Sequence, residues 1–242
     1  MKALVAGGSS GIGLSIVLDL VGREEFEQVY VLDKAEFPND YKAEKVVFSR
    51  CDFAQGDLSV LDGMNDIQAL FITAGFGHLK LFQELSDDYI QDSFSVNSVA
   101  PIRILRHYYS RLLSQEDFYC AVMVSIAARL SSPLFSVYSA TKAALSKFIE
   151  AVNVELDVQG SQNRILEVSP GSMKGTSFTG GVSHPEQTAA LALEIIERAM
   201  RHEDLFIPQY EDVFKDVIAR YEADAHGFGV DSYWYKKKQG RV

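Results

Sequence analysis

The segment KALVAGGSSGIGLSIVLDLVG, residues 2–22, decides the fold. Its first seven residues form a short apolar run that ends in glycine, which is typical of a buried strand, and residues 14–22 have helical periodicity. Between them lies the pattern G-x-x-x-G-x-G, whose glycines allow a tight turn and let backbone N–H groups approach a pyrophosphate beside the helix dipole. The segment therefore predicts a dinucleotide-binding strand, turn and helix. The turn residues expected to bind are Gly7, Ser9, Ser10, Gly11, Ile12 and Gly13.

Apolar runs and helical segments alternate along the rest of the chain. We expect further strands at 28–34, 45–53, 68–77, 119–128, 163–171 and 204–209, with helices at 86–113, 139–156, 185–200 and 211–224. This alternation predicts an α/β fold: a Rossmann-like, doubly wound parallel β-sheet with helices on both faces, formed by residues 1–242 as a single domain. Residues 171–185 are expected to be a substrate loop, and 225–242 a C-terminal tail without a clear period. Asn97 is a poor residue for a helix interior and Pro101 follows it, so we expect a local distortion there.

Composition excludes several classes of function. The 242 residues carry a formal net charge of −10, which argues against a nucleic-acid partner. The two cysteines, Cys51 and Cys120, form neither a disulfide framework nor a metal-ligand spacing, so no metal site is expected. No apolar stretch approaches the roughly 20 residues of a membrane span. Because residues 1–6 already read as the first strand, we expect no signal peptide, no membrane partner and a cytoplasmic protein.

Acidic and small residues stand at the ends of the predicted strands, where ligands bind in parallel sheets. Asp33 ends the second strand, about 20 positions past the glycine turn, where a carboxylate accepts hydrogen bonds from an adenosine ribose and repels a 2′-phosphate. Lys34, the next residue, could instead contact a 2′-phosphate, so NAD(H) is favoured while NADP(H) stays possible. Asp33 could also be an ordinary turn residue at the end of a strand. Asp52 could reach an adenine amino group or cap the next helix. Ala74 and Gly75 are small enough to admit a ligand.

Ser125, Tyr138 and Lys142 form a second group with chemical meaning. Tyr138 and Lys142 are four residues apart on a predicted helix, so they share one face. Moving a tyrosine pKa from about 10 to about 7 takes roughly 4 kcal/mol. A cation about 4 Å away supplies about 1 kcal/mol in water but about 4 kcal/mol at an effective dielectric near 20. Lys142 is thus predicted to activate Tyr138 for acid–base catalysis in a partly desolvated cleft. The bare pattern also fits an ordinary helix.

Taken together, these motifs resemble the short-chain dehydrogenase/reductase family in its short, single-domain form. The resemblance covers residues 1 to about 210 and rests on GGSSGIG at 7–13, TAG at 73–75, YSATK at 138–142 and PG at 170–171. It implies that Tyr138 is the general acid/base, that Lys142 lowers its pKa and holds the nicotinamide ribose, that Ser125 hydrogen-bonds the substrate oxygen, and that Asn97 holds a relay water. It also assigns cofactor binding to the glycine turn and to Asp33, Lys34, Asp52, Phe53, Ala74, Gly75, Pro170, Gly171, Met173 and Thr176.

The chain departs from the family pattern in three places. Ala6 stands where the family often has threonine, which removes one hydroxyl that stabilises the turn and is a minor change. Thr73 stands where the family has asparagine, so it lacks the side-chain amide of a sheet hydrogen bond. The threonine that the family places four residues past Gly171 is here Thr176, five residues past it. How the loop holds the nicotinamide amide is therefore left open.

The resemblance implies an NAD(P)(H)-dependent oxidoreductase acting on the CH–OH group of an alcohol or on a ketone. It also implies a homodimer or homotetramer formed through the helix after Asn97 and the helix that carries Tyr138. One alternative is an epimerase or dehydratase that keeps its nicotinamide bound, although such relatives usually carry G-x-x-G-x-x-G and a larger C-terminal region. A second alternative is a non-enzymatic NAD(H)-sensing protein, although such proteins often lose the tyrosine or the lysine. The sequence does not name the substrate.

Overall fold

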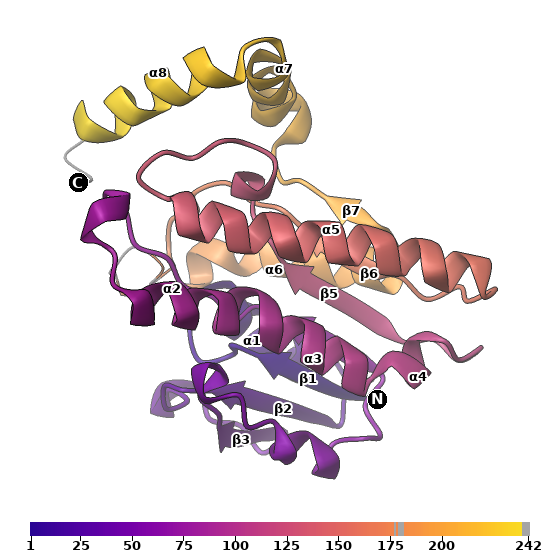
Figure 1. Ribbon diagram of the computed structural model, residues 1–242. Helices are drawn as coiled ribbons and strands as arrows, with labels where there is room; N and C mark the ends of the chain where they lie inside the picture. Colours follow the sequence, from indigo (N-terminus) through magenta and orange to yellow (C-terminus); the bar gives the residue numbers. More distant parts are fainter. Residues whose placement is uncertain (177, 179–181, 239–242) are drawn as a thin grey trace.

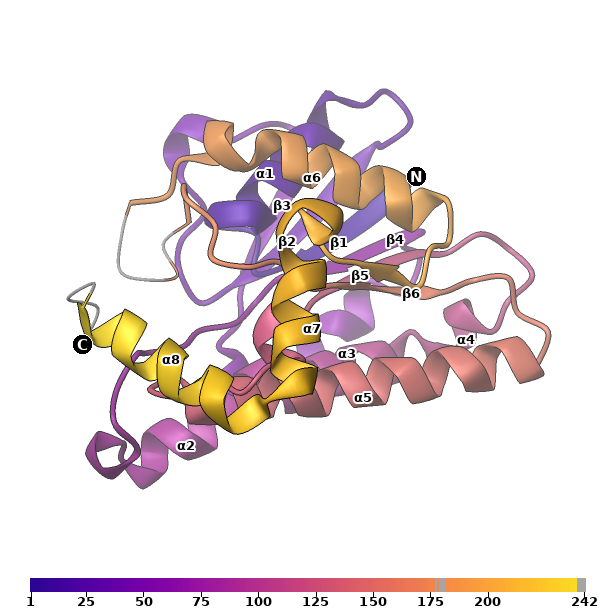
Figure 2. The ribbon, with the colours of Figure 1, turned by 90° about the horizontal axis from the view of Figure 1, so that it is seen from above.

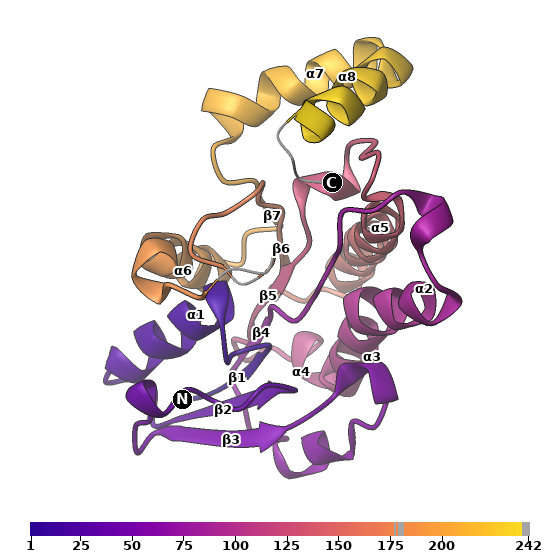
Figure 3. The same cartoon turned by 90° about the vertical axis from the view of Figure 1, so that its left-hand side faces the viewer.

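The computed structural model describes residues 1–176, 178 and 182–238. Within these residues one parallel sheet contains seven strands in the order β3-β2-β1-β4-β5-β6-β7 (Figures 1 and 3). The strands are β1 (Lys2–Ala6), β2 (Gln28–Asp33), β3 (Val46–Arg50), β4 (Ala69–Ile72), β5 (Tyr119–Met123), β6 (Ile165–Val168) and β7 (Leu205–Phe206). The strand order reverses between β1 and β4, which is where doubly wound sheets bind their ligands. The predicted fold is confirmed.

Helices cover both faces of the sheet. The helices are α1 (Gly11–Gly22), α2 (Asp87–Phe94), α3 (Ala100–His107), α4 (Tyr109–Leu112), α5 (Ser136–Val158), α6 (Pro185–Met200), α7 (Lys215–Ala223) and α8 (Ala225–Lys238). In Figure 3, α1 and α6 lie on one side of the sheet, and α2, α3 and α5 lie on the other. Strands β4 and β6 are buried along their whole length, as expected when both faces of a sheet are covered.

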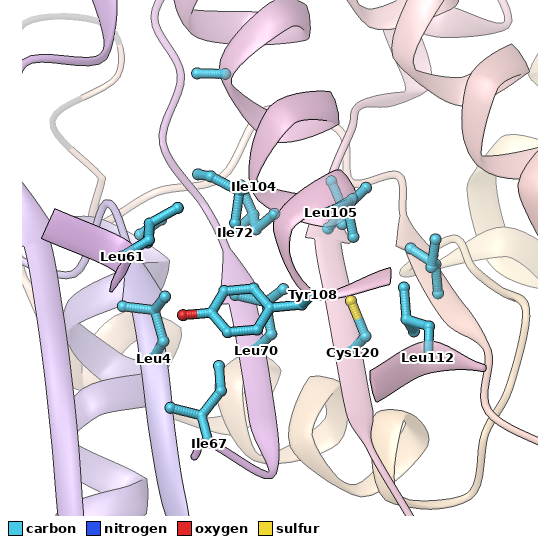
Figure 4. Packing of buried hydrophobic residues seen from close by; sticks show 14 of the residues in the cluster. Leu4, Leu61, Ile67, Leu70, Ile72, Ile104, Leu105, Tyr108, Leu112 and Cys120 are labelled. Atoms are coloured by element: carbon cyan, nitrogen blue, oxygen red, sulfur yellow. The ribbon is translucent and has the colours of Figure 1, made fainter. Parts of the chain in front are cut away.

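Each face has its own apolar core. Figure 4 shows the core between the sheet and α3, where Tyr108 lies among leucine and isoleucine side chains from β1, β4 and α3. The Tyr108 hydroxyl donates to the Met64 carbonyl at 2.9 Å, so its polar atom is satisfied inside this core. Each fully buried side chain of this size contributes about 1.5–3 kcal/mol of transfer free energy.

The strands end earlier than the sequence predicts. Strand β4 ends at Ile72 rather than near Gly77, and β5 ends at Met123 rather than near Ala128. After β4 the chain continues without regular secondary structure through residue 80, and after β5 Ser125 caps a short 3-10 helix, Ile126–Ala128. The shorter strands leave the residues that follow them at the carboxyl edge of the sheet.

A π-helical turn, Ser95–Val99, joins α2 to α3 and contains Asn97. The predicted distortion at this position is therefore present. The Ala100 N–H donates to the Ser95 carbonyl, and the next residue, Pro101, has no N–H to continue the ladder. The wider turn brings the Asn97 side chain into the interior, where it is fully buried.

The C-terminal segment differs from the prediction. From the sequence we expect the last helix to end at 224 and a tail without regular structure over 225–242. In the structure, α8 occupies Ala225–Lys238. Residues 239–242 lie outside the described part. No apolar period marks α8, in which only Gly229 is buried. The helix contacts α7 through the Tyr221 and Phe228 rings, whose centroids are 5.6 Å apart. At its far end the Lys236 ammonium donates to Ser132 Oγ and to the Pro133 carbonyl, both at 2.8 Å. Figures 1 and 3 show α7 and α8 standing above α5, apart from the sheet.

In the described residues, none of the helices has the length and apolar content that crossing a bilayer requires.

Candidate active site

The glycine turn after β1 packs directly against the end of β4. A Cβ atom on Gly7, whose φ is +91°, would lie 2.4 Å from the Ala74 nitrogen. A Cβ atom on Gly13 would lie 2.1 Å from the Gly7 carbonyl oxygen and 2.4 Å from Thr73 Oγ1. Both distances are impossible for real side chains, so these two positions require glycine. The turn is the kind of cradle that a dinucleotide phosphate needs, because backbone can approach it without obstruction.

Thr73 corrects an expectation from the sequence. It has no side-chain amide, but its hydroxyl donates to the carbonyls of Ala6 at 3.1 Å and Gly7 at 3.0 Å. Its backbone N–H also donates to the Ala6 carbonyl, at 2.7 Å. A short hydroxyl suffices because the glycine turn lies so close to β4. The connection between β1 and β4 is therefore retained without asparagine.

At the end of β2, Asp33 is fixed by the backbone around it. Its Oδ2 accepts from the Ser9 N–H at 3.0 Å, and its Oδ1 accepts from the Ala35 N–H at 3.1 Å. The carboxylate thus lies beside the glycine turn, where the sequence analysis expects a ribose. This position agrees with the predicted role but does not test it.

Lys34 and Asp52 contact each other. Lys34 Nζ lies 2.8 Å from Asp52 Oδ2, and this hydrogen bond lowers the pKa of Asp52. Asp52 Oδ1 also accepts from the Ala54 N–H at 3.1 Å, so it caps the short helix Phe53–Gln55. The capping role that the sequence left open for Asp52 is present. The ammonium proposed as a phosphate contact is held by a carboxylate.

Ser125, Tyr138 and Lys142 come together at the carboxyl edge of β5. Ser125 Oγ caps the 3-10 turn by accepting from the Ala127 N–H at 3.1 Å, and Ser125 lies close enough to Tyr138 to lower the pKa of its phenol. Tyr138 lies in the first turn of α5 and Lys142 lies one turn later. Their side chains are 7% and 2% exposed, and Lys142 Nζ lies 5.9 Å from the centre of the Tyr138 ring. These residues therefore form one desolvated group.

The pKa values in this group do not follow the prediction. Burial raises the pKa of Tyr138 to about 12, against the lowering effect of the Ser125 hydrogen bond. Burial also lowers the pKa of Lys142 to about 7. From the sequence we expect a fully charged Lys142 ammonium that interacts with the Tyr138 phenol. In the structure, Lys142 Nζ donates to the Met123 carbonyl at 2.8 Å. Desolvation opposes charge on both partners, so in this structure Lys142 does not lower the pKa of Tyr138.

Asn97 is held by the backbone of Phe76. Its Oδ1 accepts from the Phe76 N–H at 2.9 Å, and its Nδ2 donates to the Phe76 carbonyl at 2.8 Å and to Thr141 Oγ1 at 3.2 Å. A Cβ atom on Gly75 would lie 3.2 Å from Asn97 Oδ1 and 3.3 Å from Lys142 Nζ. Gly75 therefore permits Asn97 and Lys142 to approach the same point. The water relay assigned to Asn97 by resemblance stays a prediction.

Aromatic rings surround the Tyr138 phenol. The Phe135 ring stacks on it with centroids 4.3 Å apart, and the Phe178 ring meets it edge-on at 5.2 Å. A Cβ atom on Gly77 would lie 2.8 Å from both Phe135 and Tyr138. Sequence reasoning did not single out Phe135, although its place three residues before Tyr138 is a contact spacing on a helix.

The loop after β6 reaches both ends of the site. The Pro170 carbonyl accepts from the Ile126 N–H at 3.0 Å and from Ser125 Oγ at 3.4 Å, which joins this loop to the Ser125 turn. Thr176 donates to the Met173 carbonyl at 3.1 Å. The substrate loop expected at about 171–185 is described only in part, because residues 177 and 179–181 lie outside the described set.

Sequence reasoning also missed a buried carboxylate, Glu167 on β6. Its Oε1 accepts from Arg129 Nη2 and Ser169 Oγ, and its Oε2 accepts from Ser146 Oγ, all at 2.8 Å. Arg129 follows the Ser125 turn, Ser146 lies one helical turn beyond Lys142, and Ser169 immediately precedes Pro170. Glu167 thus connects the three segments that carry the site. A glutamate in an apolar strand is the signal that could have revealed it.

Comparisons with known proteins agree with this arrangement. A model of the short chain dehydrogenase family matches residues 1–187. The uncharacterized oxidoreductase TDA5 of Saccharomyces cerevisiae is 26% identical over 207 residues, which are 82% of this chain and 63% of that protein. A short chain dehydrogenase/reductase of Claviceps purpurea is 28% identical over 193 residues, 75% of this chain and 65% of that protein. The matches thus span less than two thirds of the length of either relative.

Solved structures share the fold. A short-chain dehydrogenase from Streptomyces avermitilis has a TM-score of 0.77 at 21% identity, covering 100% of this chain and 99% of that one. A 4-hydroxyisoleucine dehydrogenase complexed with NADH has a TM-score of 0.70 at 20% identity, covering 85% and 96%. A short chain dehydrogenase from Burkholderia cenocepacia J2315 in complex with NADP has a TM-score of 0.71 at 20% identity, covering 90% and 96%. The two complexes carry different cofactors, so the shared fold does not select one.

The buried ammonium of Lys142 predicts a particular dependence of stability on pH. Its pKa falls from 10.5 to about 7 on folding, so between these values the unfolded chain binds a proton that the folded chain has released. The free energy of unfolding of the wild-type chain should therefore rise with pH in this window, relative to a Lys142→Met variant, by up to about 1.4 kcal/mol per pH unit.

Urea unfolding of both proteins at pH 7, 8 and 9 measures this difference. Lys147→Met is the matched control, because Lys147 lies on the same helix with a side chain 78% exposed. Its pH dependence should parallel that of the wild type. If the Lys142→Met curve were also parallel to the wild type, the lowered pKa would be wrong.

Proposed function

The chain belongs to the short-chain dehydrogenase/reductase family, because the family model matches residues 1–187 of its 242, and from this premise we propose that it is a nicotinamide-dependent oxidoreductase acting on an alcohol or ketone. The main support is the meeting of Ser125, Tyr138 and Lys142 in a desolvated group at the same sheet edge as the glycine turn. The relatives named as oxidoreductases give further support.

The residues present suit a nicotinamide dinucleotide. The glycine turn gives its phosphates access to backbone, Asp33 lies beside that turn, and Gly75 leaves space in front of Lys142 and Asn97. When bound, the cofactor supplies or accepts the hydride. The protein then has to hold the substrate oxygen, move one proton and exclude water.

Tyr138 is suited to give a proton. With a pKa of about 12 its phenol is neutral at pH 7, so it can donate to a carbonyl oxygen as the carbonyl carbon receives hydride. Ser125 lies within hydrogen-bonding reach of the phenol and would hold the same oxygen. Lys142 would return a proton to Tyr138 after reduction, since its pKa of about 7 lets it gain and lose one near neutral pH. We therefore propose carbonyl reduction as the direction that the described state favours.

Replacing Tyr138 by phenylalanine tests this proposal. Phenylalanine keeps the ring that packs on Phe135 and Phe178 but removes the transferable proton. In a spectrophotometric screen of NADH oxidation with varied aldehydes and ketones, we expect Tyr138→Phe to lose about 100- to 10,000-fold in kcat and to bind NADH normally. Tyr119→Phe removes an exposed hydroxyl from the far end of β5 and should keep full activity.

Full turnover by Tyr138→Phe would disprove the acid–base role. Tight NADH binding without turnover of any carbonyl or alcohol would instead favour a non-enzymatic NAD(H)-sensing protein, and nicotinamide retained through dialysis would favour an epimerase or dehydratase.

We further propose that NAD(H) is preferred over NADP(H). The Asp33 carboxylate beside the glycine turn would meet a 2′-phosphate with like charge. Lys34, the cation that could offset this, is held by Asp52 at 2.8 Å and would have to leave that partner. Both features raise the free energy of binding a 2′-phosphate.

Equilibrium titration should give a dissociation constant for NADPH at least about 10-fold above that for NADH. In Asp33→Ser the ratio of the NADPH to the NADH dissociation constant should be smaller than in the wild type. Lys34→Met is the informative control. Because Lys34 is engaged by Asp52, its removal should not weaken NADPH binding; a large loss would mean that Lys34 reads the phosphate after all.

We also propose that two copies associate through α3, the helix after Asn97, and α5, the helix that carries Tyr138. The support is the resemblance to a family whose members commonly form dimers or tetramers through these two helices. Exposed apolar side chains are present at both: Val99, just before α3, and Val154 and Val158 of α5 are 47%, 60% and 81% exposed. Light scattering should find a dimer or tetramer, and Val154→Asp should dissociate it. A wild-type chain that scatters only as a monomer would contradict this.

A further inference from the structure

The first amide of α1 already has an acceptor from a distant part of the chain. The Gly11 N–H donates to Ser183 Oγ at 2.7 Å, across 172 positions of sequence. The Thr176 side chain lies over the same residue, with Cβ and Cγ2 each 3.5 Å from where a Cβ atom on Gly11 would stand. The N-terminus of α1 is therefore covered by two residues of the segment that follows β6.

Buried contacts between α1 and α6 hold Ser183 in this position. Ser15, one turn after Gly11, donates to the Pro185 carbonyl at 2.9 Å and shares a hydrogen bond of 2.7 Å with Thr188 Oγ1. Ser15 and Thr188 are 3% and 0% exposed. Figures 2 and 3 show α6 running alongside α1. Because Ser183 is only two residues before Pro185, docking of α6 on α1 brings its hydroxyl to the Gly11 amide.

A second contact closes the same segment from its other side. The His184 N–H donates to the Gly175 carbonyl at 2.9 Å, so the residue before Thr176 lies beside the residue after Ser183. The backbone next to Ser183 is thus fixed both by the contacts between α1 and α6 and by this hydrogen bond. Its oxygen occupies the place that an anionic oxygen would take at the N-terminus of a helix.

We propose that Ser183 competes with the pyrophosphate of the cofactor for the Gly11 amide and thereby weakens cofactor binding. A single N–H makes one good hydrogen bond, so a phosphate oxygen must displace the hydroxyl or accept a poorer geometry. The hydroxyl is neutral, so the helix dipole attracts it less than it attracts a phosphate. This inference rests on the proposed function only in that a dinucleotide binds at the glycine turn.

Removing the hydroxyl tests the proposal. In Ser183→Ala the Gly11 amide loses its internal acceptor, so NADH and ADP, which both carry a pyrophosphate, should bind about 2- to 10-fold more tightly. Adenosine, which has no phosphate, should bind as it does to the wild type. Ser110→Ala is the matched control: it is the same change at an exposed serine of α4, a helix that contributes nothing to the site, and it should alter none of the three dissociation constants.

Calorimetric titration with the three ligands measures these constants without requiring turnover. Unchanged or weaker binding of NADH and ADP to Ser183→Ala would overturn the inference, because Ser183 would then be neutral or would itself hold the cofactor. Equal tightening for adenosine would also overturn it. Tighter ADP binding in a protein that reduces no carbonyl would uphold this inference while the proposed function failed. If neither ADP nor NADH bound to the wild type or to Ser183→Ala, both this inference and the proposed function would be wrong.

Discussion

The site depends on one close contact, that between the glycine turn after β1 and the first residues past β4. At Gly7 and Gly13 the two backbones approach until no additional atom fits, and the Thr73 hydroxyl fastens them together. This contact lies where the strand order reverses, so it also fixes the point at which the carboxyl ends of β1, β4 and β5 face the same space. The glycine turn, Gly75 and Ser125 reach one region of the molecule because of it.

Within that region, removal of water has more influence than pairing of charges. Tyr138 and Lys142 are so well buried that each is driven toward its neutral form, and for Tyr138 the nearby Ser125 offsets this only in part. The buried Glu167 carboxylate accepts hydrogen bonds from three donors and joins the segments around the site. Desolvation is therefore the main influence on Tyr138 and Lys142, while hydrogen bonds hold the segments that surround them.

Much of this could be predicted from the sequence, for identifiable reasons. Local patterns such as the glycine turn, the helix beginning at Pro185 and the break at Asn97 depend on neighbouring residues, and the structure has them. The sign of the Tyr138 shift could not be predicted, because it depends on how completely distant segments exclude water. The contacts of Ser183 with Gly11 and of Lys34 with Asp52 join residues whose approach no spacing rule reveals. Helix α8 was missed because separate contacts with α7 and with Ser132 hold it rather than an apolar stripe.

The last part of the chain contacts two loops of the candidate site. The Phe214 ring, just before α7, lies so near Gly171 that a Cβ atom there would be 2.5 Å from it, and Lys236 at the end of α8 holds Ser132 and Pro133. Both anchors lie beyond residue 187, where the match to the family ends. The course of the backbone at Gly171 and at Ser132 and Pro133 is therefore set in part by residues that the family model does not match. A chain shortened before Phe214 would keep the matched segment and lose both of these supports.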